Sequence, residues 1–328
     1  MSLTNPSERP LLAVLEDQAR SSVTGRHRIR FLHAMTTADF QKRSPGDAGF
    51  AMMATANGRH VGQVRFEVEP EAVQLVGRGS SLAAVLEALK KHRIADDVRW
   101  SEPASEAVIA LYGEQAAALV EATLGAAPER GTFVDLSWDG VPVRAIHVDA
   151  VASELARAAV HLRLPTAHGP SLRVKLLAAG AEPLDGADWQ RLRIEAGWPL
   201  DGVDLTAEDV ALASDRLAAT VSWTKGCFLG QEVYVMARDR GELPKRLRGV
   251  VVPGPGAPAV HAELFESAQT GVPGVAKVQG VVGSFAPSAD GYLALAMVRR
   301  KVAEPGTELA LSDGRRVRVV GLPTVSRR

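Results

Sequence analysis

The stretch SWTKGCFLGQEVYVMAR, residues 222–238, contains the only cysteine of this 328-residue chain. Cys227 follows Lys225 and Gly226, and a Gln-Glu pair comes directly after Gly230. Glycines allow tight turns and close approach of a ligand to the backbone, and a nearby lysine favours the reactive thiolate form of a cysteine. These residue types indicate thiol chemistry on a tight loop. The alternative is that Cys227 is a small buried apolar residue, and the residues alone leave both interpretations open.

The cysteine count also limits the chemistry and the compartment. One cysteine cannot form an internal disulfide, which is typical of a reducing compartment. It cannot hold a zinc ion or an iron–sulfur cluster without other ligands, so we expect no resident metal site. The N-terminus lacks a basic segment followed by an apolar core, and no run of 18 apolar residues occurs. We therefore expect a cytoplasmic protein that does not contact a membrane.

Charge is balanced over the chain but differs between its parts. The 38 basic and 38 acidic residues cancel, whereas residues 244–328 carry 12 Lys and Arg against 6 Asp and Glu. A basic C-terminal part on an acidic body could attract a polyanion. Because no aromatic residues alternate with these arginines as nucleic-acid platforms require, we favour an ordinary basic surface and expect no direct nucleic-acid binding.

The chain up to about residue 243 mixes helical and strand patterns. The patterns predict helices at 81–94, 114–125 and 169–180, the last two ending at Gly125 and Gly180. Strands are predicted at residues 49–55, 61–69, 72–77, 141–148 and 159–164. This alternation is typical of α+β modules with mainly antiparallel sheets. Segments 28–125 and 130–225 resemble each other, so we expect two modules, at about 1–125 and 126–243.

Residues 244–328 have a different pattern. Short strands are predicted at residues 246–252, 275–285, 291–302, 307–311 and 315–321, and Gly- and Pro-rich turns separate them. Asp313-Gly314 is a strong hairpin signal between the last two. A small β-barrel or sandwich is the natural interpretation of this part.

Three blocks of the sequence, in order, resemble those of a known family. They are RFLHAMTTADFQKRSPG near the N-terminus, WQRLRIEAGWPLDG, and TKGCFLGQEV followed by ARDRG and KRLRG; the NGR at 57–59 matches a turn in the same pattern. The chain thereby resembles the YgfZ branch of the YgfZ/GcvT family, folate-binding relatives of the glycine-cleavage T protein. The last block carries the most specific matches, which are Lys225, Gly226, Cys227, Phe228, Gly230, Gln231, Glu232, Arg238, Arg240, Gly241, Arg246 and Leu247.

The resemblance implies a fold and a ligand. It implies a GcvT-like folate-binding domain of α+β modules around a central opening, at 1–243, and a small C-terminal β-barrel at 244–328. Tetrahydrofolate or a derivative would bind in that opening, and Cys227 would lie on a loop reachable from it. The candidate positions for cofactor binding are Glu195, Trp189, Arg193, Lys225, Gly226, Gln231, Glu232, Arg238 and Arg240.

Physical chemistry supports some of these assignments. Glu195 stands at the family's pterin-binding position, and a carboxylate can accept both neighbouring N–H groups of a pterin. Trp189 could stack on a folate ring, although a core tryptophan is an equal alternative. Arg238 and Arg240 are candidates for the glutamate carboxylates of folate, because guanidinium groups pair well with carboxylates.

One segment departs from the family pattern. Aminomethyltransferases of this family carry an aspartate pair where this chain has Gly62 and Gln63, and no carboxylate occurs between Asn57 and Arg65. Without it the reacting amine lacks its acid/base partner. We therefore do not expect glycine-cleavage activity.

Two functions remain open at this point. The resemblance implies a folate-dependent accessory protein for iron–sulfur protein assembly or repair, including tRNA-modifying enzymes, with Cys227 as its chemical group and iron–sulfur client or assembly proteins as partners. The alternative is a folate-dependent one-carbon (aminomethyl) transferase. A folate-binding scaffold without chemistry is a third interpretation.

Overall fold

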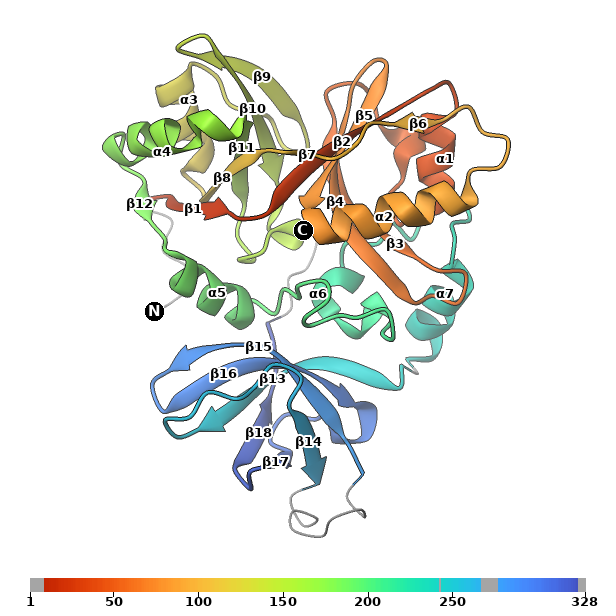
Figure 1. The fold of residues 1–328 in the computed structure, drawn as a ribbon, viewed down its shortest axis with the longest axis vertical. Coiled ribbons are helices and arrows are strands. Elements are labelled where there is room, and N and C mark those ends of the chain that lie inside the picture. Colours follow the sequence, from red (N-terminus) through yellow and green to blue (C-terminus); the bar gives the residue numbers. More distant parts are fainter. Residues whose placement is uncertain (1–8, 242, 267–276, 324–328) are drawn as a thin grey trace. The chain divides into compact units, whose positions relative to one another are not determined.

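The computed structural model describes residues 9–241, 243–266 and 277–323 (Figure 1). They form two compact units built from alternating segments of the chain. Unit 1 comprises the chain up to Met53, Val61–Gly186 and Thr220–Leu229, and unit 2 comprises Ala54–His60, Ala187–Ala219 and the chain from Gly230. Within the described residues, no helix has the length and apolar character needed to span a membrane.

The first sheet of unit 1 packs against two helices. Its strand order is β3 (Ala48–Ala54), β4 (His60–Val68), β5 (Ala72–Arg78), β2 (Gln18–Thr24) and β6 (Arg99–Trp100), and β7 (Ala104–Ser105) also pairs with β2. The neighbouring pairs β4–β5 and β5–β2 are antiparallel. Helices α1 (Arg28–Met35) and α2 (Gly79–His92) supply Leu32, Leu82 and Leu89 to the apolar core of this sheet.

The second sheet of unit 1 takes strands from both ends of the segment. Its order is β12 (Glu182–Pro183), β1 (Leu11–Leu15), β8 (Ala107–Tyr112), β11 (Ala159–Leu164), β10 (Val141–Val148) and β9 (Phe133–Trp138). Helices α3 (Ala116–Leu124) and α4 (Gly169–Ala178) pack on it through Val120, Leu172 and Leu176. Strands β1 and β8 come from the first predicted module, up to residue 125. They nevertheless pair in the sheet that contains β9, β10 and β11 from the second module.

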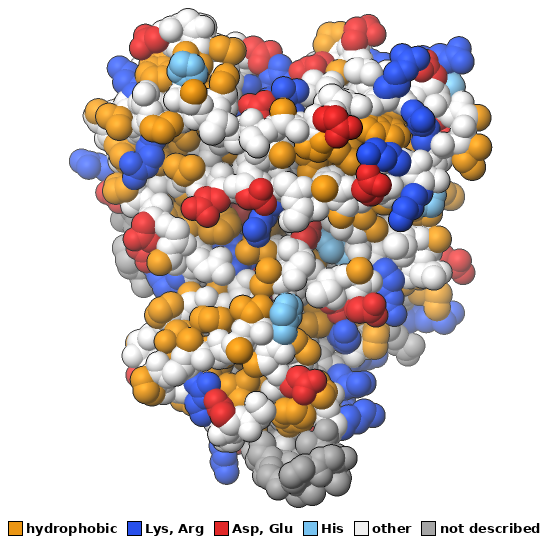
Figure 2. Space-filling view, in the orientation of Figure 1, with side chains coloured by type: hydrophobic (Ala, Val, Ile, Leu, Met, Phe, Trp, Pro, Cys, Tyr) orange, Lys and Arg blue, Asp and Glu red, His pale blue; other side chains and the backbone are white. Residues whose placement is uncertain are grey.

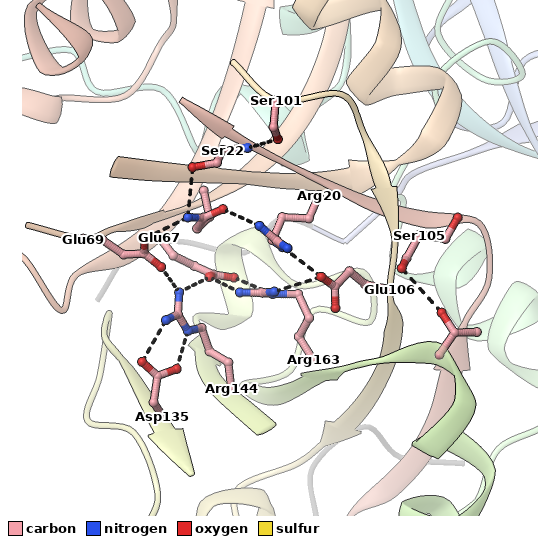
Figure 3. A network of polar contacts seen from close by, with 12 residues as sticks. Arg20, Ser22, Glu67, Glu69, Ser101, Ser105, Glu106, Asp135, Arg144 and Arg163 are labelled. Atoms are coloured by element: carbon pink, nitrogen blue, oxygen red, sulfur yellow. Dashed lines mark hydrogen bonds and ion pairs between the residues drawn. The ribbon is translucent and has the colours of Figure 1, made fainter. Parts of the chain in front are cut away.

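A chain of charged side chains connects the two sheets of unit 1 (Figure 3). Arg144 on β10 forms ion pairs with Asp135 at 2.6 Å and with Glu67 on β4 at 2.9 Å. Arg163 on β11 forms an ion pair with the same Glu67 at 2.6 Å. Glu67 is buried, and a buried carboxylate needs such partners to offset its desolvation. The network therefore ties β4 to β10 and β11.

Unit 2 contains a closed barrel in the order β13 (Lys245–Pro253), β16 (Gly291–Arg299), β15 (Gly280–Ser288), β14 (Glu263–Glu266), β17 (Glu308–Leu311) and β18 (Arg316–Val320). Its interior is lined by small aliphatic residues such as Val250, Val282 and Val319. The hairpin expected at Asp313-Gly314 joins β17 to β18, with Gly314 at φ 86°. The same unit holds helices α5 (Gly186–Glu195), α6 (Asp215–Ala218) and α7 (Gln231–Arg240).

The predicted fold class is confirmed: α+β with a closed C-terminal barrel. Each predicted helix and strand has a counterpart, although residues 275–276 of the strand predicted at 275–285 lie outside the described residues. Residues 1–8, which belong to the N-terminus analysed for a signal peptide, lie outside as well. On the face shown in Figure 2, acidic and basic side chains are interspersed, and no broad field of one sign covers it.

Candidate functional site

The loop that carries Cys227 is anchored by a buried lysine. Lys225 donates from Nζ to the backbone carbonyls of His33, Thr36 at 2.5 Å and Ala38 at 2.9 Å. Burial lowers the pKa of Lys225 to about 8, and the charge of Asp39 opposes that shift. Three accepting carbonyls match the three donors of an ammonium group. Lys225 thus holds the loop against the end of α1.

Two backbone bonds complete this anchoring. Leu229 N–H donates to Ala34 at 2.9 Å, and Ser222 N–H donates to Thr37 at 3.1 Å. Between these attachments Gly226 and Cys227 are exposed. A thiol at an exposed position does not fill space in the core, so the structure contradicts the alternative that Cys227 is a small buried residue.

The ammonium group of Lys225 is not directed at Cys227, as the spacing of the two residues in the sequence had suggested. The sequence suggested that Lys225 faces the cysteine and lowers its pKa. In the structure its ammonium is committed to the carbonyls of residues 33–38 and lies 5.0 Å from the ring centre of Phe228. Its role there is to fix the loop backbone.

His33 and Asp39 lie beside this loop, and the sequence analysis did not single them out. His33, near the end of α1, is 7% exposed, and its Nδ1 lies 3.3 Å from Oδ1 of Asp39. Burial lowers the pKa of His33, the charge of Lys225 lowers it further, and Asp39 opposes both. The imidazole is therefore neutral near pH 7.

The segment expected to bind the pterin lies in unit 2. Glu195 is the last residue of α5, and its half-exposed carboxylate accepts a hydrogen bond from Arg191 at 2.9 Å. Trp189 on the same helix is half-buried. Trp189 and Arg193 are four residues apart on this helix, so these two predicted positions share one face of it.

Arg193 is fully buried, unlike the other predicted arginines. Its Nη1 donates to Asp204 at 3.0 Å, and its Nε donates to Gln190 at 3.1 Å. Asp204 in turn accepts from the backbone N–H of Ser284 on β15 at 2.6 Å. Arg193 thus links α5 to the barrel. It would contribute to folate binding by fixing the position of this helix.

The remaining predicted positions lie on α7. Glu232 is exposed in the first turn, and Gln231 is half-buried. Arg238 and Arg240 are exposed in the last turn, and Arg238 contacts Asp239 at 2.6 Å. Gly230, which precedes the helix, has φ 79°, and a Cβ there would stand 2.5 Å from the carbonyl oxygen of Thr55. That position therefore requires glycine.

Comparison with known proteins gives a consistent result. No family model matches the chain. A tRNA-modifying protein YgfZ from Yersinia enterocolitica is 26% identical over 264 residues, which cover 80% of this chain and 77% of the relative. An aminomethyltransferase from Mycobacterium avium is 25% identical over 305 residues, covering 92% of this chain and 78% of the relative. The resemblance to the YgfZ/GcvT family is confirmed. An aminomethyltransferase T structure from Bartonella henselae shares the fold, with a TM-score of 0.76 at 20% identity, covering 98% of this chain and 88% of that one.

Within this YgfZ/GcvT-like fold, the predicted residues fall into three groups. Lys225, Gly226 and Cys227 lie on one loop of unit 1, where the structure adds His33 and Asp39. Glu195, Trp189 and Arg193 lie on α5, and the last four positions lie on α7, both in unit 2. The signal for His33 and Asp39 was the N-terminal block RFLHAMTTADF. His33 and Asp39 lie 194 and 188 residues before the cysteine, so spacing in the sequence could not link them to it.

No cluster of three or more His, Cys, Asp or Glu side chains suited to a metal ion occurs in the described part of the chain. Gly62 and Gln63, at the place of the family's aspartate pair, lie on β4. A Cβ on Gly62 would stand 2.9 Å from the carbonyl oxygen of Ser81 in α2. The packing of β4 against α2 therefore leaves no room for a side chain at position 62.

Proposed function

We propose that this chain is a tetrahydrofolate-binding accessory protein for the assembly or repair of iron–sulfur proteins, including tRNA-modifying enzymes, and that Cys227 is its chemical group. The observation that carries the proposal is the exposed thiol of Cys227 on a loop whose lysine anchor is buried. Reactive cysteines lie at partly exposed positions, whereas buried structural cysteines are inert. The similarity to relatives named tRNA-modifying protein YgfZ supports the same function.

Residues 1–243 serve as the folate-binding part in this proposal, and residues 244–328 form the barrel domain. Glu195 is the residue that recognises the pterin, because its carboxylate is half-exposed and accepts hydrogen bonds. Arg191 already donates to one oxygen of this carboxylate, and the carboxylate keeps acceptor capacity for a pterin. Client proteins of the iron–sulfur class would be the macromolecular partners.

A folate-dependent aminomethyl transferase is the second candidate. The Mycobacterium avium aminomethyltransferase, which aligns with 92% of this chain, favours it. The absence of a carboxylate between Asn57 and Arg65 opposes it, because the transfer needs a proton acceptor at the amine. We therefore rank it below the accessory function.

Calorimetric titration with tetrahydrofolate tests the ligand. Replacing Glu195 by Gln keeps the shape but turns one acceptor toward the pterin N–H groups into a donor. We expect Glu195→Gln to weaken binding by about 1.5–3 kcal/mol, the scale of a hydrogen bond to a charged group. Asp188→Asn is the matched control, because Asp188 contacts the same Arg191 at 3.3 Å but is not assigned to folate. Equal affinity of the wild type and Glu195→Gln would refute this placement.

A further inference from the structure

Two segments of unit 1 form a local basic surface, which we call the basic tip. They are RHRIR at 26–30, around the start of α1, and KKHRIADDVR at 90–99, from the last turn of α2 to β6. Together they hold seven Lys and Arg and two Asp. Residues 1–243 carry 26 basic residues (38 minus 12) against 32 acidic ones (38 minus 6). The basic tip is therefore opposite in charge to the part of the chain that contains it.

The two aspartates hold the two segments of the basic tip together. Asp97 contacts Arg26 at 3.7 Å and Arg99 at 3.3 Å. Asp96 forms an ion pair with Arg30. The side chains of the three arginines nevertheless remain 77%, 76% and 68% exposed, in the same order. Figure 2 shows Lys and Arg side chains gathered at the upper right, where Figure 1 draws α1 and β6.

Helix stability does not account for the arginines at the start of α1. Arg28 and Arg30 stand in the first turn of α1, and none of the described residues of that turn is acidic. The N-terminus of a helix carries a partial positive charge, so cations are unfavourable there. The last turn of α2 is different, because its Lys90 and Lys91 suit the negative end of the helix dipole. Lys90 also pairs with Glu87 at 2.6 Å.

The basic tip also carries an exposed apolar side chain. Ile94 is 94% exposed and directly follows Arg93. The guanidinium of Arg93 lies 5.2 Å from the ring centre of Trp100, which is half-buried. Arg93 thus covers one face of this ring, so the ring is not an open platform for stacking. The basic tip therefore presents an aliphatic side chain surrounded by cations.

We propose that the basic tip is a docking surface for an acidic face of the iron–sulfur client protein, and that Ile94 enters an apolar pocket of that partner. Protein interfaces combine a buried apolar anchor with a polar rim, and opposite charges speed and orient the encounter. This inference deepens the proposed function and rests on its client proteins. It adds the partner's chemistry, which is a negatively charged surface around an apolar pocket.

The same observations disfavour two other occupants. The phosphates of an RNA would match the charges, but a phosphate backbone offers no pocket for Ile94, and single-stranded nucleic acid binds through aromatic rings that stack on its bases. A membrane surface needs several apolar side chains on one face. Among the described residues of the basic tip, Ile94 is the one large apolar side chain that is exposed.

Binding of defined anionic probes to the full-length chain tests this surface. The main probe is a fluorescein-labelled peptide of repeated Leu-Glu-Glu, followed by fluorescence anisotropy, and the parallel probes are bulk tRNA and phosphatidylglycerol vesicles. We expect the wild type to bind the peptide and to lose affinity as salt rises, because salt screens exposed charges. Arg26→Glu combined with Lys91→Glu should weaken peptide binding about tenfold, and Ile94→Ser about fivefold.

Matched controls make the same changes on the barrel. Arg316→Glu combined with Lys301→Glu reverses two exposed charges, and Val260→Ser removes an exposed apolar side chain; both should bind the peptide as the wild type does. Equal peptide affinity of the wild type and the basic-tip variants would overturn the proposal. A loss of tRNA or vesicle binding alone in these variants would overturn it too. If the double variant at the basic tip fails to fold, Ile94→Ser decides by the same criterion.

A test in cells separates this inference from the proposed function. In a Yersinia strain without its own tRNA-modifying protein YgfZ, the wild type should restore iron–sulfur-dependent tRNA modification. The basic-tip variants should restore clearly less, although their affinity for tetrahydrofolate equals that of the wild type. Full restoration by these variants would overturn the docking surface. A wild type that restores nothing would contradict the proposed function, and the peptide titration then decides alone whether the basic tip binds acidic proteins.

Discussion

Lys225 shows how a residue chosen for its chemistry can have a structural role. Its position two residues before Cys227 suggested a charge beside the thiol, but its ammonium donates to the carbonyls of His33, Thr36 and Ala38. Lys225 is buried whereas Cys227 is exposed, so the two side chains lie in different surroundings. The group that the structure places next to the loop is His33, whose imidazole edge lies against Gly226.

Removing the ammonium of Lys225 should therefore cost stability. In Lys225→Met the apolar stem stays, but three buried carbonyls lose their charged donor, and we expect the free energy of unfolding to fall by about 2–4 kcal/mol. Urea unfolding of the full chain measures this loss. The control is Lys42→Met, which removes an exposed lysine paired with Asp39 and should cost no more than about 0.5 kcal/mol. Equal losses of unfolding free energy in the two variants would show that the bonds from Lys225 to the three carbonyls do not stabilise the fold.

At the scale of elements, β4 illustrates what pattern reading can and cannot predict. The alternation in residues 61–69 predicts a strand, and β4 covers His60–Val68. The reason for glycine at position 62 was not visible, because the neighbour that excludes a side chain is α2, almost 20 residues further along. Helices α5 and α7 were also not predicted, since their apolar residues follow no clear periodicity and their stability comes from contacts distant in sequence.

Gly62 should be intolerant of any side chain. We expect Gly62→Ala to lower the free energy of unfolding by about 1–3 kcal/mol, the usual cost of overpacking a core position. Gly186→Ala is the matched control, because a Cβ there meets nothing within 4 Å.

Glycine-cleavage assays with the other components of that system should detect no activity in the wild type or in Gln63→Asp. Activity in the wild type would contradict our reading of this segment.

At the scale of the whole molecule, the two compact units explain why the functional motif was only partly readable. The signature block is continuous in sequence, yet residues up to Leu229 belong to unit 1 and residues from Gly230 to unit 2. The sequence predicted the α+β class, the barrel and the motif itself, because these depend on local patterns and on family resemblance. It could not predict the charged network of Glu67, Arg144 and Arg163 or the position of His33, because these depend on residues that only the fold brings together.

Unit 1 also contains a buried histidine, His161, whose protonation makes the stability of the fold depend on pH. Glu154 contacts Arg65 at 2.5 Å, and His161 lies 3.8 Å from the same carboxylate. Burial, followed by the charge of Arg65, lowers the pKa of His161 to about 3, and Glu154 opposes the shift only in part. The unfolded chain therefore binds a proton at His161 below about pH 6.5 that the folded chain does not. Stability from this residue is fully present above that pH and is lost as the pH falls toward 3.

Acidification should consequently destabilise the wild type more than His161→Gln, which has no proton to gain. Between pH 7 and pH 5 we expect the wild type to lose about 2 kcal/mol more than the variant, from about 1.4 kcal/mol for each pH unit below 6.5. Urea unfolding at the two pH values, with His168→Gln as an exposed histidine control, measures the difference. Parallel losses in the wild type and His161→Gln would mean that His161 is protonated in the folded chain.

The central claim is that the exposed thiol of Cys227 performs the function. Its most direct test is to express Cys227→Ala in a Yersinia strain that lacks its own tRNA-modifying protein YgfZ and to measure iron–sulfur-dependent tRNA modification. Because the side chain is exposed, the variant should fold with a free energy of unfolding within about 0.5 kcal/mol of the wild type. Thr224→Ala, at another exposed position of the same loop, is the control and should restore modification as the wild type does. We predict that Cys227→Ala restores none. Full restoration by this variant would contradict the account and leave the cysteine loop with a structural role only.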